Sequence, residues 1–203
     1  MRYVLLLRGI NVGGRNKIVM ADLRQAVADL GYDNVETYIN SGNLFFDSTK
    51  SRGDIVTDFQ TFFATTYPFV KQFALLDAQD YQAEIDQLPA WWQEELARKD
   101  VLFFTEGLEK QTMIDYIQSL MLGDEIVSIS AYAIYWGKYS EDSYLQTAYH
   151  KQLAKSPFYK QVTIRNSKTF SAISNYLNTK KNTKTSLICN ALDIFLFAII
   201  GKI

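Results

Sequence analysis

The sequence predicts an α+β protein made of two ferredoxin-like subdomains, each with the element order β-α-β-β-α-β. Three observations lead to this fold class. Short apolar runs typical of buried strands alternate with segments whose apolar residues fall at helical spacing. The same order occurs twice along the 203 residues, which indicates an internal duplication. Residue identity between the halves is slight, so the duplication is predicted from element order alone.

The first half is predicted to contain four strands and two helices. The strands are residues 3–7, 35–39, 44–46 and 70–76, all rich in apolar side chains. Residues 20–30 have apolar side chains at helical spacing, and Gly31 ends that helix. Ser51 with Asp54 three residues later resembles a capping box, and an apolar stripe from Ile55 to Phe63 gives the second helix.

The second half repeats this order after a connecting segment. Residues 77–88 are predicted to be a connecting helix, which Pro89 and the tryptophans after it interrupt. The later strands are predicted at 101–104, 126–129, 133–136 and 162–165, and the helices at 113–121, at 144–153 and after residue 166. We therefore expect a first subdomain at 1–76, a connecting helix and linker at 77–99, a second subdomain at 100–177 and an apolar tail at 178–203.

The composition excludes several kinds of site. Hydrophobic residues make up 48% and charged residues 21%, which is ordinary for a globular protein. The one cysteine, Cys189, and the one histidine, His150, exclude an internal disulfide, a cysteine-rich zinc site and a histidine cluster. No nucleophile–base pair stands out, so neither a reaction nor a cofactor is predicted. The apolar run at 3–7 is too short for a signal peptide, and we expect the cytoplasm.

A glycine-rich loop follows the first predicted strand. Residues 9–17 have the form G-x-x-x-G-G-x-x-K, which fits neither a phosphate loop nor a dinucleotide fingerprint. Glycines still let backbone N–H groups approach an anion, and Arg8, Arg15 and Lys17 would add positive charge. The alternative is a tight turn that needs glycine for positive φ angles.

A second polar segment, residues 40–43, lies between two predicted strands and could be only a hairpin turn. In a ferredoxin-like sheet the first and third strands are antiparallel neighbours, so this turn and the glycine-rich loop should share one edge. We expect Arg8, Asn11, Asn40 and Ser41 on one concave surface, with the Arg8 guanidinium reaching the loop. The predicted ligand-binding residues are Arg8, Gly9, Asn11, Gly13, Gly14, Arg15, Lys17, Asn40, Ser41, Asn43 and Arg165.

These segments resemble a known family. Residues 7–14 (LRGINVGG), 37–43 (TYINSGN) and the T-x-R-N motif at 163–166 closely resemble the bacterial family known as domain of unknown function 1697. The resemblance covers about residues 2–177 and implies a duplicated ferredoxin-like arrangement without implying an activity. The family usually continues T-x-R-N with tryptophan, whereas this chain has Ser167 and so lacks any packing or stacking contact of that tryptophan.

Three interpretations of the function stay open. The first is a protein, with or without catalytic activity, that binds a small phosphorylated or nucleotide-like anion at the glycine-rich loop. The second is a nucleic-acid-associated protein, because residues 143–192 contain eight Lys/Arg and no acid, although the net charge of −1 argues against unspecific binding. The third is an interaction module. Arg165, at a strand end, could pair with an acid or with a ligand.

Two apolar features bear on partners. Residues 3–7 and 44–46 are apolar on both faces, whereas helices cover only one face of a ferredoxin-like sheet, so the second half or a second copy of the chain must cover the other. Residues 187–200 are strongly apolar but would span only about 21 Å as a helix, too short for a membrane span. We expect that segment to pack on the protein or on a second copy.

Overall fold

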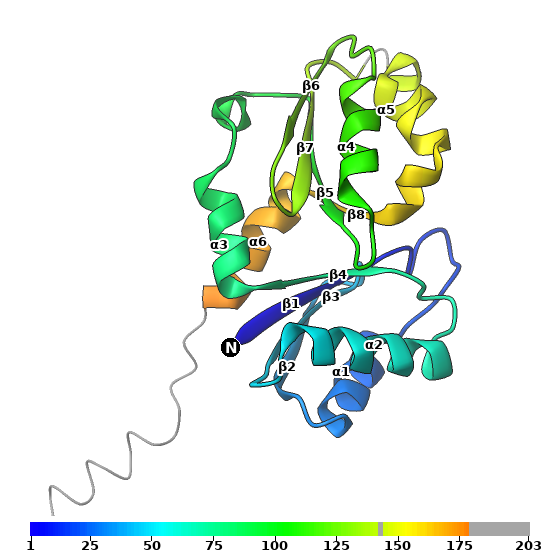
Figure 1. Cartoon of the computed structure of the whole chain (residues 1–203), viewed down its shortest axis with the longest axis vertical. Coiled ribbons are helices and arrows are strands. Elements are labelled where there is room, and N and C mark those ends of the chain that lie inside the picture. The colour runs from blue at the N-terminus through cyan, green and yellow to red at the C-terminus, as the bar shows by residue number, and fades with distance from the viewer. Residues whose placement is uncertain (142–143, 179–203) are drawn as a thin grey trace, which may run out of the picture.

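The protein folds into two four-stranded antiparallel sheets with helices, an α+β architecture with two subdomains (Figure 1). The computed structural model describes residues 1–141 and 144–178, so the apolar segment at 187–200 lies outside the described residues. Across these two ranges, no helix is both long enough and apolar enough to cross a membrane.

The first sheet has the strand order β2-β3-β1-β4. Its half of the chain consists of β1 (Arg2–Leu7), α1 (Met20–Asp29), β2 (Asp33–Tyr38), β3 (Asn43–Asp47), α2 (Arg52–Thr66) and β4 (Phe73–Asp77). The predicted cap at the start of α2 is present, since the Ser51 side chain accepts a hydrogen bond from the Asp54 N–H. β1 pairs antiparallel with β3, with Leu6 opposite Asn43. The end of β1 therefore lies beside the turn before β3, as expected.

The second sheet has the corresponding order β6-β7-β5-β8. After α3 (Ala78–Asp86) and the 3-10 helix η1 (Ala90–Gln93) come β5 (Arg98–Phe104), α4 (Lys110–Gln118), β6 (Glu125–Ile129), β7 (Ala133–Lys138), β8 (Val162–Asn166) and α6 (Ser167–Asn178). The continuous helix predicted at 144–153 is wrong. This stretch contains η2 (Tyr144–Gln146), α5 (Ala148–Lys151) and η3 (Leu153–Lys155), and η4 (Pro157–Gln161) follows. Thr147 is extended and caps α5, which interrupts the helix.

The two sheets share one apolar core. One face of β1, including Leu5 and Leu7, packs with α1 and α2. Its other face, including Val4 and Leu6, joins a cluster that contains Phe103 of β5 and Phe170 of α6. Helices α3 and α6 contact each other beside this shared core, while α4 and α5 cover the outer face of the second sheet (Figure 1). The second half therefore covers the apolar face of the first sheet.

Candidate functional site

A cavity of about 330 Å³ lies where the loop after β1 meets β8 and the segment before it. Three parts of the chain line it: the end of β1 with the following loop, the turn before β3, and the stretch around β8. The lining residues are Leu7, Arg8, Gly9, Ile10, Val12, Ser41, Tyr159, Val162, Thr163, Ile164 and Arg165. The two polar segments of the first half thus meet a third segment that comes from the second half.

Glycines shape the loop through the backbone conformations that they permit. Gly9, Gly13 and Gly14 have φ angles of +67°, +57° and +74°, and a Cβ atom at any of them would meet nothing within 4 Å. Val12 and Arg15 form an isolated antiparallel bridge around Gly13 and Gly14. These two glycines therefore make the tight turn that was the alternative to a phosphate cradle. Arg15 and Lys17 are exposed and, like Gly13 and Gly14, do not line the cavity.

Asparagine side chains fix the position of the loop. The Asn11 amide donates to the carbonyls of Ile18 (3.0 Å) and Asn40 (2.9 Å), and its oxygen accepts from the Ile18 N–H (2.8 Å). Asn16 donates to the Gly9 carbonyl. Asn11 and Asn40 therefore join the loop to the turn before β3, although neither lines the cavity.

The turn before β3 packs tightly against the end of β1. The Leu7 N–H donates to the Gly42 carbonyl at 2.8 Å. Gly42 has a φ of +81°, and a Cβ atom there would lie 2.7 Å from the Leu7 Cβ. Only glycine fits this approach, which brings Ser41 to the cavity. Asn43 is fully buried, and its amide nitrogen donates to Tyr38 O and Ser41 Oγ.

Arg8 leaves β1 and reaches across to the second half. Its Nε donates to the Val162 carbonyl at 2.9 Å and its Nη2 to the Tyr159 carbonyl at 2.8 Å. The guanidinium also lies 5.4 Å from the centre of the Tyr159 ring. Burial lowers the pKa of Arg8. The expectation that this guanidinium would reach the glycine-rich loop is therefore wrong, because the β8 region offers carbonyl acceptors and an aromatic face.

Arg165 makes the reciprocal connection from β8 to the first half. It is 5% exposed, and burial lowers its pKa to about 10. It uses all five N–H donors of its guanidinium, and every acceptor is neutral. These acceptors are Asn43 Oδ1, Thr163 Oγ1 and the carbonyls of Ile164, Leu7 and Gly42. Arg165 therefore pairs with neither an acid of the protein nor, through its own donors, a ligand.

The charge of the cavity is consequently unbalanced. No Asp or Glu is among its lining residues. Within the described ranges, neither Arg8 nor Arg165 forms an ion pair. The N–H groups of Gly9 and Ile10 make no hydrogen bond to the part of the chain that the structure describes. Two guanidinium groups with neutral partners thus stand beside a cavity that still has unused donors.

The loop after β5 holds the corresponding place in the second half. The Glu106 N–H donates to the Phe73 carbonyl of β4 at 2.9 Å, much as the loop after β1 contacts β8. Here a cation has acidic partners: the Glu106 carboxylate accepts from Arg52 Nη2 at 2.6 Å and from the Leu75 N–H at 3.3 Å, and Arg52 also lies 3.9 Å from Asp80. A cavity of about 240 Å³ at this place has Arg52, Lys110 and the acid Glu106 in its lining.

The structure brings some of the predicted site residues together and separates others. Arg8, Gly9, Ser41 and Arg165 line one cavity. Asn11, Asn40 and Asn43 do not line it, but Asn11 donates to the Asn40 carbonyl, and Asn43 contacts Ser41 and Arg165. Tyr159 and Val162 were not predicted, and the sequence has no signal that links them to Arg8 across some 150 residues. The described residues include no group of three or more His, Cys, Asp or Glu that could hold a metal ion.

Comparison with known proteins places this fold in a family. Residues 1–135 match the profile of a family described as "Protein of unknown function (DUF1697)". The chain belongs to the DUF1697 family. It is also similar to a solved structure, the conserved bacterial protein SP0830 from Streptococcus pneumoniae, with 54% identity and a TM-score of 0.84. That similarity covers 87% of this chain and 98% of the other. No curated protein matches the chain. The family that the motifs suggested is confirmed.

Proposed function

We propose that this DUF1697 protein binds a small phosphorylated or nucleotide-like anion in the cavity between Arg8 and Ser41. One observation carries the proposal: two arginines with only neutral hydrogen-bond partners stand at a cavity that no acid lines. Taking a guanidinium out of water costs free energy that neutral carbonyls recover only in part. An anion that enters the cavity gains from both charges in a medium that screens them weakly.

The two arginines have different tasks in this proposal. Arg8 uses its Nε and one N–H of Nη2, so three of its five N–H donors remain for the ligand. Arg165 has no donor left and contributes only its charge. The Ser41 hydroxyl accepts from Asn43 and can still donate its own hydrogen. These donors suit a phosphate, whose oxygens accept several hydrogen bonds at once.

The remaining lining suits an apolar part of the ligand. Five aliphatic side chains line the cavity, namely those of Leu7, Ile10, Val12, Val162 and Ile164. A phosphate monoester with a ring or an aliphatic substituent would place its charge at Arg8 and its substituent against these side chains. Inorganic phosphate would use only the charged end and should bind more weakly than such an ester.

A thermal-shift screen with nucleotides and phosphorylated metabolites tests the proposal, because a ligand that binds the folded state stabilises it. Titration calorimetry with the best ligand then compares Arg8→Ala with Arg15→Ala. Arg15 is the matched control, since it lies at the exposed tip of the same loop and does not line the cavity. We expect Arg8→Ala to weaken binding by about 1.5–3 kcal/mol, the scale of a hydrogen bond to a charged group, and Arg15→Ala to leave it unchanged.

Two results would contradict the proposal. Equal affinity in the wild type and Arg8→Ala would remove Arg8 from the site. Equal losses in Arg8→Ala and Arg15→Ala would mean that the anion binds the exposed loop by its general charge. The nucleic-acid alternative gains no comparable support, because Arg165, one of its eight cations, is buried. Oligonucleotide binding that weakens steeply with salt would revive it.

We also infer that the halves are two copies of one ferredoxin-like unit, at about residues 1–76 and 100–177 with a connection at 77–99. The matching strand orders support this inference. Superposition of the two sheets tests it: α1 should fall on α4, and a misfit of these helices would contradict it. The cytoplasmic location stays a prediction, which fractionation of cells that express the full chain would check.

A further inference from the structure

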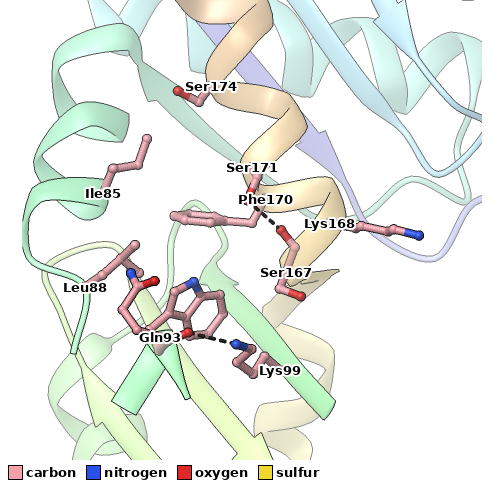
Figure 2. A pocket seen from close by; sticks show the side chains of 10 residues that line it. Ile85, Leu88, Gln93, Lys99, Ser167, Lys168, Phe170, Ser171 and Ser174 are labelled. Carbon is pink, nitrogen blue, oxygen red and sulfur yellow. Dashed lines mark hydrogen bonds between the residues drawn. The ribbon is translucent and has the colours of Figure 1, made fainter. Parts of the chain in front are cut away.

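A second cavity, of about 550 Å³, lies between α3, η1 and α6 (Figure 2). The residues that matter for its chemistry are Ile85, Leu88, Trp92, Lys99, Ser167 and Phe170. It has no lining residue in common with the cavity around Arg8. No acidic residue lines it, although two lysines do.

One side of this cavity is apolar and firmly held. Phe170 is 2% exposed and Trp92 is 7% exposed, and their rings meet edge to face with centroids 5.9 Å apart. Ile85 and Leu88, at the other side of the opening, complete an apolar wall (Figure 2). A hydrocarbon chain between these side chains would be shielded from water on both of its faces. This burial contributes about 25 cal/mol of binding free energy for each Å² of apolar surface removed from water.

The other end of the cavity carries a positive charge with neutral partners. The Lys99 ammonium donates to the carbonyls of Trp92 at 2.8 Å and Glu94 at 2.9 Å, which leaves its third N–H for a ligand. Lys99 forms no ion pair within the described ranges. The Ser167 hydroxyl likewise makes no hydrogen bond to the described part of the chain. Figure 2 shows Ser167 and Lys99 at the same end, whereas Lys168 points away from the cavity.

We propose that this cavity binds an apolar monocarboxylate. Its carboxylate would accept hydrogen bonds from Lys99 and Ser167, and its hydrocarbon body would lie against Ile85, Leu88 and Phe170. One ammonium N–H and one hydroxyl supply two donors, which matches the two oxygens of a single carboxylate. A phosphate dianion has more acceptor oxygens than these two donors can pair at this end of the cavity. The ligand therefore differs in charge and in polarity from the one proposed for the Arg8 cavity.

Titration calorimetry of the full chain with octanoate tests this proposal. The matched probes are octanol, which has the hydrocarbon chain without the charge, and acetate, which has the charge without the hydrocarbon chain. We expect octanoate to bind at least tenfold more tightly than either one. Lys99→Met should weaken octanoate at least tenfold and leave octanol unchanged, while Lys151→Met, at an exposed position of α5 that lines neither cavity, should change neither.

A second variant keeps the test decisive if Lys99→Met does not fold. Ser171 is exposed at the surface and lines the cavity, so Ser171→Phe should fold and weaken octanoate binding by occupying part of the space. Amide chemical shifts should change on octanoate addition at residues 167–174 and not at residues 8–10. Equal binding of octanol and octanoate, full binding by Lys99→Met or by Ser171→Phe, or shifts confined to residues 8–10 would each overturn the proposal.

Discussion

The loops after β1 and β5 have equivalent places in the two halves but opposite electrostatic states. Each loop leaves the first strand of its half and contacts the last strand of the other half, through Arg8 to the Val162 carbonyl and through Glu106 to the Phe73 carbonyl. At the β5 loop, the Glu106 carboxylate is paired with Arg52. At the β1 loop, the guanidinium groups of Arg8 and Arg165 have only neutral partners.

The contact of the β5 loop contains a cation and an anion, whereas the contact of the β1 loop contains cations without an anion. Glu106 and Arg52 form an ion pair across the contact between the two halves. The interface around β8 keeps one buried cation, Arg165, and one half-buried cation, Arg8, and a buried charge without an opposite charge is costly. Similar backbone contacts therefore hold the two halves together at the β5 loop and, in our proposal, form a ligand site at the β1 loop.

Replacement of Arg165 should have the largest effect on this comparison. Arg165→Met removes the charge and leaves several buried acceptors, including the Leu7 and Gly42 carbonyls, without donors. We expect a loss of about 3 kcal/mol or more in the free energy of unfolding, since each unsatisfied buried group costs about 1–3 kcal/mol. Urea denaturation measures it. A variant as stable as the wild type would show that water replaces the guanidinium and that the contact between the halves does not depend on Arg165.

A carboxylate added to the β1 loop side should make the two interfaces alike. Ser41 lines the cavity with both arginines, so Ser41→Asp supplies the acid that this cavity lacks. We expect anion affinity to fall at least tenfold, because the new carboxylate competes for Arg8, while thermal stability is kept or raised. Ser41→Asn is the control of similar shape. If Asp and Asn weaken binding equally, the loss is steric and the comparison of charges fails.

Neutralising Glu106 should have a smaller effect and one confined to stability. The Arg52 side chain is 41% exposed and the Glu106 side chain 19% exposed, so water screens their ion pair. For Glu106→Gln we expect about 0.5–1 kcal/mol less stability and no change in anion affinity. Denaturation and calorimetry on the same sample check both parts. An affinity change of tenfold or more would place the β5 loop in the ligand site.

Mild alkali should have the smallest effect. Burial lowers the pKa of Arg165 to about 10, so this group keeps its charge from about pH 7 to about pH 9. We expect constant anion affinity over that interval and a decline as the pH passes about 10. For stability the sign is reversed: the unfolded chain holds this proton more tightly, so Arg165 favours the folded state increasingly above about pH 10. A midpoint near pH 8 in the affinity would assign the binding to another group.

Much of the fold follows from local patterns in the sequence. The apolar run at 3–7 and the stripe from Ile55 to Phe63 identify β1 and α2, and Ser51 marks where α2 begins. The short helices between β7 and β8 do not follow, because their apolar side chains keep helical spacing while Thr147 caps a new turn. The cap depends on the backbone conformation of one residue, which periodicity does not encode.

Apart from Arg165, the site could be predicted only on its first-half side. Pairing of the first and third strands places Ser41 near Arg8 once the topology is assumed. The other side depends on how the second sheet docks, since Tyr159 and Val162 meet Arg8 through their carbonyls, and any residue type offers a carbonyl. In the sequence Arg15 and Lys17 also looked equivalent to Arg8, because the docking of the second sheet, which buries part of Arg8, could not be predicted. Only burial distinguishes them.

The reciprocal contacts of Arg165 also have a consequence for synthesis of the chain. The Leu7 and Gly42 carbonyls emerge from the ribosome more than a hundred residues before the guanidinium that they accept from. Until α6 appears, the apolar face of Val4, Leu6 and Phe45 also lacks the part of its cover that Phe170, Ile173 and Leu177 supply. Ribosome-bound chains that end before residue 162 should therefore be bound by chaperones and cleaved readily by proteases, and chains that include α6 should not. β8 of the second sheet thus supplies donors that two carbonyls of the first half require.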